Sequence, residues 1–262
     1  MRVCNSELIV LNHPIIENVD RLVKTGCNRI ELMMDGAAWD SYQADFSTLI
    51  GKLRSRNVHY SIHPAAWDIN LAAATKILRE AAWEHHLQAL NFGVEIGASQ
   101  VVIHPGFVGS PCFSKELAQK RAREFTDRLA DKAKSLGIRL AFENVGINGQ
   151  SIYTEGEFIK ALDDVDPVVG YLIDTGHAHV NNWDIPRLIK TLSNRLVGLH
   201  IHDNHGKQDE HLPMYEGSIV WDEVLEAIKT YARDCELILE YAPGTPLEEL
   251  VKGRNTLLDR LA

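Results

Sequence analysis

The sequence predicts an α/β fold, a closed (β/α)8 barrel forming a single domain over residues 1–262. Short runs rich in Val, Ile, Leu and Phe alternate eight times with longer amphipathic segments, which is typical of a parallel sheet covered by helices. The count of eight favours closure of that sheet into a barrel. An open doubly wound sheet is the alternative, but the glycine-rich phosphate-binding turns that usually follow its first strand are absent.

The predicted strands are four to eight residues long and show little alternation between polar and apolar residues. Such runs are expected of strands that are buried on both faces, as in a barrel wrapped by helices. In order along the chain, they cover residues 2–6, 29–33, 59–63, 100–104, 139–144, 169–174, 196–202 and 235–241.

An amphipathic helical segment follows each predicted strand. The fourth stops before Gly137, and Gly is the usual residue just beyond a helix end. Thr154 and Glu157 form a capping box that opens the fifth. The predicted helices cover residues 15–25, 45–56, 70–97 (one helix or a pair), 115–136, 155–165, 184–195, 219–234 and 246–261.

The composition limits the environment and the partners of the chain. A formal net charge of −9 gives no general attraction to nucleic acid or to an anionic membrane, and mildly favours a small or metal-bridged substrate. We find no secretory signal and no apolar run of about 18 residues that could span a membrane. Widely spaced cysteines indicate reduced thiols in a cytoplasmic protein.

Six consecutive predicted strands end in His, Asp or Glu directly after an apolar run. Because parallel strands of a barrel end at one face, these side chains are expected to meet in one bowl. A single such residue would mark only where a strand meets solvent, but six in succession indicate a metal site. Mixed imidazole and carboxylate ligands suit Zn, Mn, Co or Fe. The six residues are His63, His104, Glu143, Asp174, His200 and Glu240.

These residues resemble, strand by strand, the xylose isomerase-like TIM barrels, which include sugar and sugar phosphate isomerases and epimerases and endonuclease IV. The most specific segments are VVIHPG, AFENVG, LIDTGHAHVNNWD and GLHIHDNHGKQDEHLPMYEGSI. For the sugar epimerases, the resemblance implies one divalent ion held by Glu143, Asp174, His200 and Glu240. For endonuclease IV it implies three ions, with His63, His104, His177, Asp209 and His211 as further ligands. The expected cofactor is therefore one to three divalent ions.

Four residues are candidates for substrate binding. Glu31 ends the second strand, where it could orient a ligand, bind a substrate hydroxyl or pair inside the barrel. Trp67 follows His63 closely and is the tryptophan best placed to line a pocket. His177 can reach the bowl from beyond the sixth strand, as a ligand or a substrate contact. His202 shares its side of the seventh strand with His200, and either a substrate contact or a structural role fits that position.

The resemblance implies a metal-dependent isomerase or epimerase of a sugar or sugar phosphate, working through an enediolate. Glu143 and Glu240 would be the metal-bound acid and base that remove and return a proton beside the substrate carbonyl. A dehydratase, or an endonuclease IV-like phosphodiesterase acting on abasic DNA with a multinuclear zinc site, is the alternative. The loops at 34–45 and 203–211 carry more acid than base, which disfavours nucleic acid as a partner.

Overall fold

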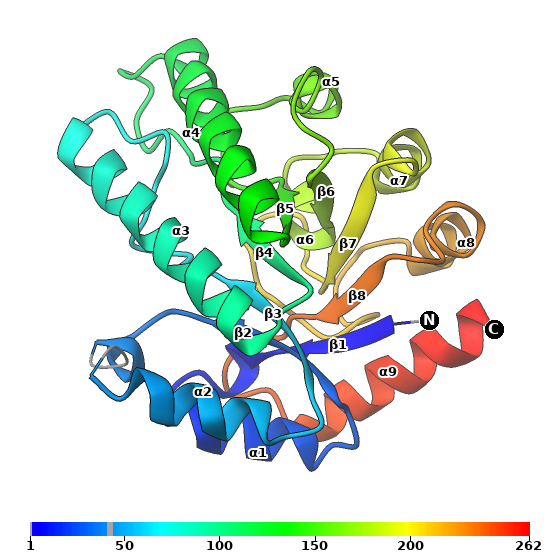
Figure 1. Ribbon diagram of the computed structural model, residues 1–262. Helices are drawn as coiled ribbons and strands as arrows, with labels where there is room; N and C mark the ends of the chain where they lie inside the picture. The colour runs from blue at the N-terminus through cyan, green and yellow to red at the C-terminus, as the bar shows by residue number, and fades with distance from the viewer. Residues whose placement is uncertain (1, 41–43) are drawn as a thin grey trace.

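The computed structural model describes residues 2–40 and 44–262. Within these residues, eight parallel strands pair in sequence order and β8 closes against β1, which confirms the predicted barrel. Figure 1 shows the strands at the centre with the helices around them. The strands are β1 Arg2–Ser6, β2 Arg29–Met33, β3 His59–His63, β4 Gln100–Ile103, β5 Arg139–Glu143, β6 Val169–Asp174, β7 Leu196–Ile201 and β8 Glu236–Leu239.

The helices occupy the predicted segments, although several are shorter. They are α1 Ile15–Val23, α2 Phe46–Arg54, α3 Lys76–Ile96, α4 Lys115–Leu136, α5 Glu155–Lys160, α6 Thr175–Val180, α7 Ile185–Leu192, α8 Trp221–Tyr231 and α9 Leu247–Leu261, with short 3-10 turns at Glu7–Val10 and Ala37–Trp39. The bounds of α4 and the capping box of α5 are as predicted.

Two helix predictions differ from the structure for local reasons. The segment 70–75 is not helical, because the Asn70 side chain bonds the amide of Ala72 and the backbone of Phe107 instead. The short helix α6 was not predicted. It begins where the Asp174 carboxylate accepts a hydrogen bond of 2.6 Å from the amide of His177, an N-terminal cap. This cap turns the chain sharply at the end of β6, so that His177 faces the bowl.

A layer of apolar side chains fills the barrel beneath the strand ends. Cys4, Val102, Ala141, Leu172 and Ile238 form this buried cluster. The last four lie two residues before a strand-end His, Asp or Glu, and residues two apart in a strand share a face. The layer is therefore the floor on which those polar residues stand.

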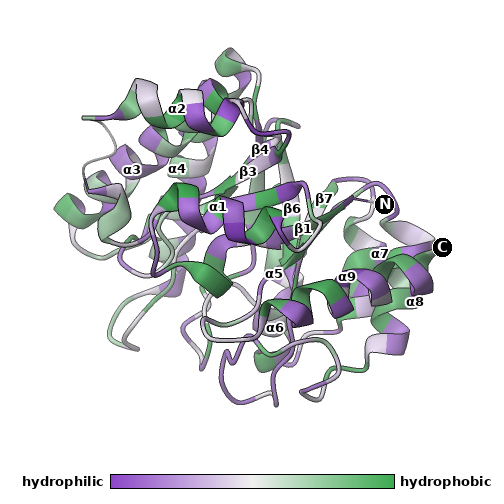
Figure 2. Cartoon of the chain, turned by 90° about the horizontal axis from the view of Figure 1, so that it is seen from below, coloured by the Kyte–Doolittle hydropathy of each residue, from purple (hydrophilic) through white to green (hydrophobic). Residues whose placement is uncertain are grey.

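The helices pack their apolar faces on the outside of the barrel. In α7, for example, the buried residues Ile185, Leu188, Ile189 and Leu192 repeat with helical spacing. Figure 2 shows hydrophilic and hydrophobic residues alternating along such helices. Within the described ranges, no helix has both the length and the apolar character that a membrane crossing requires.

Candidate metal centre and pocket

The barrel brings all nine predicted metal ligands into one cluster. His63, Glu143 and Asp174 are the last residues of β3, β5 and β6, and His104 and Glu240 follow directly after β4 and β8. His200 lies in β7 and His177 in α6, while Asp209 and His211 come from the loop between β7 and α8. Each has an imidazole nitrogen or carboxylate oxygen within 4 Å of another member.

His200 is at the centre of the first group. Its Nδ1 atom lies 3.4 Å from Glu143 Oε1, 3.4 Å from Glu240 Oε2 and 3.7 Å from Asp174 Oδ2. Among the described residues, this buried nitrogen has no hydrogen-bond partner. The imidazole of His200 and these three carboxylates together form a donor set that suits Zn, Mn, Co or Fe. These residues therefore fit the divalent ion that the sequence implies.

Glu31 fixes the orientation of the His200 ring. The Nε2 atom of His200 lies 2.9 Å from Glu31 Oε1, and the hydroxyl of Ser61 donates to Glu31 Oε2 at 3.2 Å. A carboxylate at Nε2 holds the proton there, so the lone pair at Nδ1 faces the other three ligands. Glu31 is fully buried and does not line the pocket. This position favours its predicted role in orienting a ligand over contact with a substrate hydroxyl.

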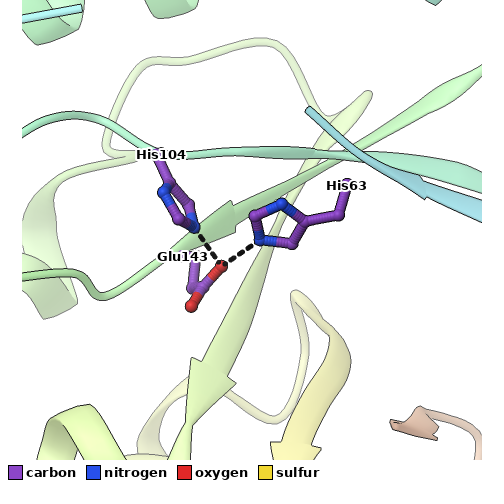
Figure 3. A group of neighbouring side chains, drawn as sticks. All are labelled: His63, His104 and Glu143. Carbon is purple, nitrogen blue, oxygen red and sulfur yellow. Dashed lines mark hydrogen bonds and ion pairs between the residues drawn. The ribbon is translucent and has the colours of Figure 1, made fainter. Parts of the chain in front are cut away.

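A second group surrounds the other oxygen of Glu143. His104 Nε2 lies 2.9 Å and His63 Nε2 3.5 Å from Glu143 Oε2, and Figure 3 shows both rings pointing at that carboxylate. His63 is oriented like His200, because its Nδ1 donates to the carbonyl of Pro64 at 2.6 Å and leaves Nε2 free to face the site. Glu143 therefore lies between both groups and could bridge two ions.

The third group comes from the loop after β7. Asp209 Oδ2 lies 3.2 Å from His177 Nε2 and 3.0 Å from His211 Nε2. His211 has a φ of 49°, a left-handed conformation that is uncommon outside glycine and is often found at functional sites. Its Nδ1 donates to the backbone carbonyl of Glu240 at 3.0 Å, so Nε2 is the nitrogen left for a ligand or ion.

Asp203 anchors this loop. Its buried carboxylate accepts hydrogen bonds from the indole of Trp221 at 2.8 Å and from the amides of Gly217 and Ile219 at 3.0 and 3.1 Å. These bonds connect the start of the loop to its end, so the segment that carries Asp209 and His211 is held against the barrel. Nothing in the sequence indicates this role of Asp203, since only the fold reveals which amides surround its carboxylate.

The cluster favours positive charge. Burial alone raises the pKa of the Glu143 carboxyl, but the imidazoles of His104 and His200 outweigh burial and hold this pKa well below its ordinary value. Burial alone lowers the pKa of His200, yet Glu240 and Glu143 raise it well above the usual range. The Glu143 carboxylate thus stays ionised, and together with Glu240 it favours a positive charge at His200. This is the electrostatic environment expected of a metal site.

His202 is buried among the candidate ligands, and with His211 and Glu240 it forms a further group that could hold a metal ion. Its Nε2 atom is 2.9 Å from Asp174 Oδ2 and 3.1 Å from Oδ1, and its ring stacks on His211 with centroids 3.9 Å apart. The side chain is fully buried and does not line the pocket. His202 is thus placed to orient Asp174, which favours the structural alternative over a substrate contact.

The pocket above the cluster has a volume of about 200 Å³. Trp67 and His177, two of the predicted substrate contacts, line it, and Trp67 is 58% exposed. The wall of this pocket contains seven of the nine candidate metal ligands, and its other side chains are neutral. The neutral lining residues are Leu8, Met33, Ala66, Trp67, Phe107, Val145, Gly146, Ile147 and Gln150.

Two residues that the sequence analysis did not single out hold the Trp67 loop. Both carboxylate oxygens of Asp35 accept from the amide of Ala66, at 2.9 and 3.1 Å, and His85 Nε2 accepts from the amide of Ala65 at 3.0 Å. Burial raises the pKa of Asp35, and the nearby His63 partly offsets this rise. A lone Asp after a strand and a histidine in a helix carry no sequence signal for this role.

Comparison with protein families gives a match over most of the chain. The model of the family described as "Xylose isomerase-like TIM barrel" matches residues 19–259. Among curated relatives, "Uncharacterized protein MJ1311" of Methanocaldococcus jannaschii is 24% identical over 265 residues, 98% of this chain and 88% of that protein. "Probable endonuclease 4" of Acholeplasma laidlawii is 30% identical over 187 residues, 65% of this chain and 62% of that protein.

Solved structures with the same fold cover the whole chain. A D-tagatose 3-epimerase-like protein superposes with a TM-score of 0.86 at 23% identity, over 100% of this chain and 97% of that chain. The IOLI protein, solved with a bound zinc atom, gives a TM-score of 0.82 at 19% identity, over 100% and 98% of the two chains. At these identities the likeness establishes the fold.

Proposed function

The chain belongs to the xylose isomerase-like TIM barrel family, and from that premise we propose that it is a divalent-metal-dependent isomerase or epimerase of a sugar or sugar phosphate. The observation that carries the proposal is the arrangement around His200 Nδ1, where an oriented imidazole meets Glu143, Asp174 and Glu240. A divalent ion bound there would supply a Lewis acid that polarises a substrate carbonyl.

The chain itself supplies two carboxylates for proton transfer. Glu143 and Glu240 both line the pocket, and they approach His200 Nδ1 from β5 and β8. The lowered pKa of Glu143 keeps it ionised at neutral pH, and this is the form that can accept a proton from the carbon beside a carbonyl. Glu240 is then the group that returns a proton.

The comparisons support a sugar over other substrates. The D-tagatose 3-epimerase-like protein shares the fold over the full chain, and its name likens it to a sugar epimerase. The IOLI protein, which has the same fold, was solved with a bound zinc atom, and this supports metal binding by the present chain.

Solvent exchange tests the proposal directly. We expect the metal-loaded protein, incubated in deuterated water with a panel of ketoses and ketose phosphates, to incorporate deuterium at the carbon next to the carbonyl. Turnover without exchange would contradict the enediolate route. Neither turnover nor exchange across the panel would contradict the sugar assignment, and loss of water detected by mass spectrometry would favour a dehydratase.

One observation favours a phosphodiesterase as the second candidate. All nine residues that endonuclease IV would use are present in one cluster, and a relative carries the name "Probable endonuclease 4". Against it, the loops near the bowl carry more acid than base. We therefore expect negligible affinity for abasic-site DNA at physiological salt. Incision of an abasic duplex that is lost in Glu143→Gln would establish the nuclease instead.

A further inference from the structure

A groove between the helices α3 and α4 lies apart from the candidate metal centre. Figure 1 shows these two helices next to each other on the outside of the barrel. The groove has a volume of about 300 Å³, and within the described residues it shares no lining residue with the pocket above the cluster. Its lining residues are Lys76, Arg79 and Glu80 of α3 and Leu117, Lys120, Arg121, Glu124, Phe125 and Arg128 of α4.

The groove is positively charged, although the protein as a whole is acidic. Five of its lining side chains are cations and two are carboxylates, so its formal net charge is +3, whereas that of the whole chain is −9. On both helices the lining residues follow the i, i+3, i+4 spacing of a single helical face. Their side chains therefore gather on facing sides of α3 and α4, where a concave surface of one charge attracts ions of the opposite charge.

Two arginines of the groove converge on one backbone oxygen. Arg79 Nη1 donates to the carbonyl of Ala73 at 2.7 Å, and Arg121 Nη1 donates to the same oxygen at 3.4 Å. Because a carbonyl is a neutral acceptor, these bonds fix both guanidinium groups without cancelling their charge. Like charges held close together repel each other, and an anion bound between them would remove that repulsion. The bonds use only Nη1 of each guanidinium, so further N–H groups of both are left to bind an anion.

Most of the other cations in the groove also lack a carboxylate partner. Lys76 is the exception, since it lies 3.4 Å from Glu80. The guanidinium of Arg128 lies 4.0 Å from the centroid of the Trp83 ring, which is again a neutral partner. In the part of the chain that the structure describes, no carboxylate oxygen lies within 4.0 Å of a side-chain nitrogen of the other four cations, which are Arg79, Lys120, Arg121 and Arg128. The groove thus holds several positioned charges that the protein itself leaves uncompensated.

From these contacts we propose that the groove between α3 and α4 binds a diphosphate group. Guanidinium groups bind phosphate oxygens through paired N–H donors, and a diphosphate has enough oxygens to contact Arg79 and Arg121 at the same time. Lys120 adds an ammonium at the side of α4. Helix α3 begins at Lys76 without an acidic residue in its first turn, so the positive end of its dipole adds to the attraction.

The same diphosphate chemistry is presented by inorganic pyrophosphate and by a nucleoside diphosphate. A second hollow of about 210 Å³ adjoins the groove and shares Arg121 with it. The exposed side chains of Leu78 and Phe113 line this hollow, where they offer an apolar surface to a base. The two sources are therefore distinguished by whether the hollow contributes to binding.

Calorimetric titration of the metal-loaded protein with inorganic pyrophosphate tests the proposal. We expect saturable binding that is weakened about tenfold or more in Lys120→Glu, because the replacement reverses one charge of the groove. Lys120 is exposed, so the fold should persist, as circular dichroism can verify. Lys132→Glu is the matched control. It makes the same change of charge on α4, but about 18 Å further along the helix and beyond the screening length at physiological salt, so the affinity should change less than about twofold.

Three outcomes would overturn the proposal. The first is the absence of saturable binding at millimolar pyrophosphate. The second is an equal loss of affinity in Lys120→Glu and Lys132→Glu, which would mean attraction by the general charge of α4. The third is binding that is lost in Glu143→Gln and kept in Lys120→Glu, which would place the pyrophosphate on the metal ion.

Titration with ADP then identifies the source of the diphosphate. Binding of ADP that is tighter than that of pyrophosphate, and that falls to the pyrophosphate level in Phe113→Ala, would support a nucleotide. Equal or weaker binding of ADP, with the same sensitivity to Lys120→Glu, would support a free diphosphate.

Discussion

The Nε2 atom of His200 lies 2.9 Å from the Oε1 atom of Glu31, and both side chains are fully buried. The pair crosses the barrel interior from β7 to β2 and determines which ring nitrogen faces the candidate metal ligands. A hydrogen bond from a ligating histidine to a carboxylate fixes the ring orientation and raises its basicity. If the cluster holds a divalent ion as proposed, Glu31 is expected to strengthen its binding through His200 without being a ligand itself.

Replacing Glu31 with Gln should weaken metal binding by about 10- to 100-fold, the usual effect of losing such a partner. The amide still accepts from Nε2, but it lacks the charge that strengthens the bond. Competition with a chelating dye measures the dissociation constant. Ser61→Ala is the matched control, since it removes a bond to Glu31 Oε2 but leaves the contact with His200. Equal metal affinity in Glu31→Gln and the wild type would contradict this role.

Changing either pocket carboxylate should stop the proton transfer. Glu143→Gln and Glu240→Gln are each expected to lower the rate by at least ~10²-fold, the lower range for general acid–base catalysis. Solvent deuterium exchange and turnover measure the fall in rate. Elemental analysis of the metal content distinguishes a loss of metal binding from a loss of proton transfer. A variant that keeps its metal and its full rate would exclude that residue as acid or base.

Removing the Asp35 carboxylate should loosen the pocket wall. In Asp35→Ala the amides of Ala66 and Trp67 lose their acceptor, a cost of about 0.5–1.5 kcal/mol because these amides are only partly buried. We expect KM to rise with little change in kcat, because Trp67 lines the pocket as a proposed substrate contact and is not one of the proposed acid–base residues. Acrylamide quenching reports on the loop, since Trp67 is 58% exposed. Trp67→Phe identifies its share of the signal. A fall in kcat at constant KM would contradict the prediction.

The positions of the candidate ligands could be predicted because the carboxyl ends of all strands in a parallel barrel lie close together at one face. Glu143 and Asp174 each end a buried strand, and parallel neighbours necessarily end at the same face. The sequence indicated Glu31 as a candidate for orienting a ligand, among other roles, but it could not indicate which residue Glu31 contacts. Glu31 and His200 are 169 positions apart, and their pairing depends on how the barrel closes. The same holds for Asp35, whose partners lie in the next loop of the barrel.

Glu7 is a buried carboxyl, and no Lys, Arg or His of the described residues is bonded to it. Its oxygens accept from the amide side chain of Asn18 at 2.7 Å and from the backbone of Met33 at 2.9 Å, and the residue is 1% exposed. Burial raises its pKa to about 7, and the two hydrogen bonds offset only part of that rise. Glu7 is not among the nine candidate metal ligands, so its titration can be measured apart from theirs.

Because Glu7 has this raised pKa, its contribution to the free energy of unfolding falls as pH rises. Between the ordinary value of 4.5 and about 7, the folded protein binds a proton at Glu7 that the unfolded chain does not. The contribution is therefore fully present below the unfolded pKa, declines as pH rises through the folded pKa, and totals on the order of 3 kcal/mol. Glu7→Gln cannot titrate at this position and should lose this pH dependence.

Urea unfolding of the wild type and of Glu7→Gln at about pH 5 and about pH 8.5 measures the effect. Subtracting the change in the variant from the change in the wild type cancels the pH dependence of metal binding, which both proteins share. We expect the wild type to lose more stability than the variant between these values, whereas parallel losses would mean that Glu7 is ionised throughout.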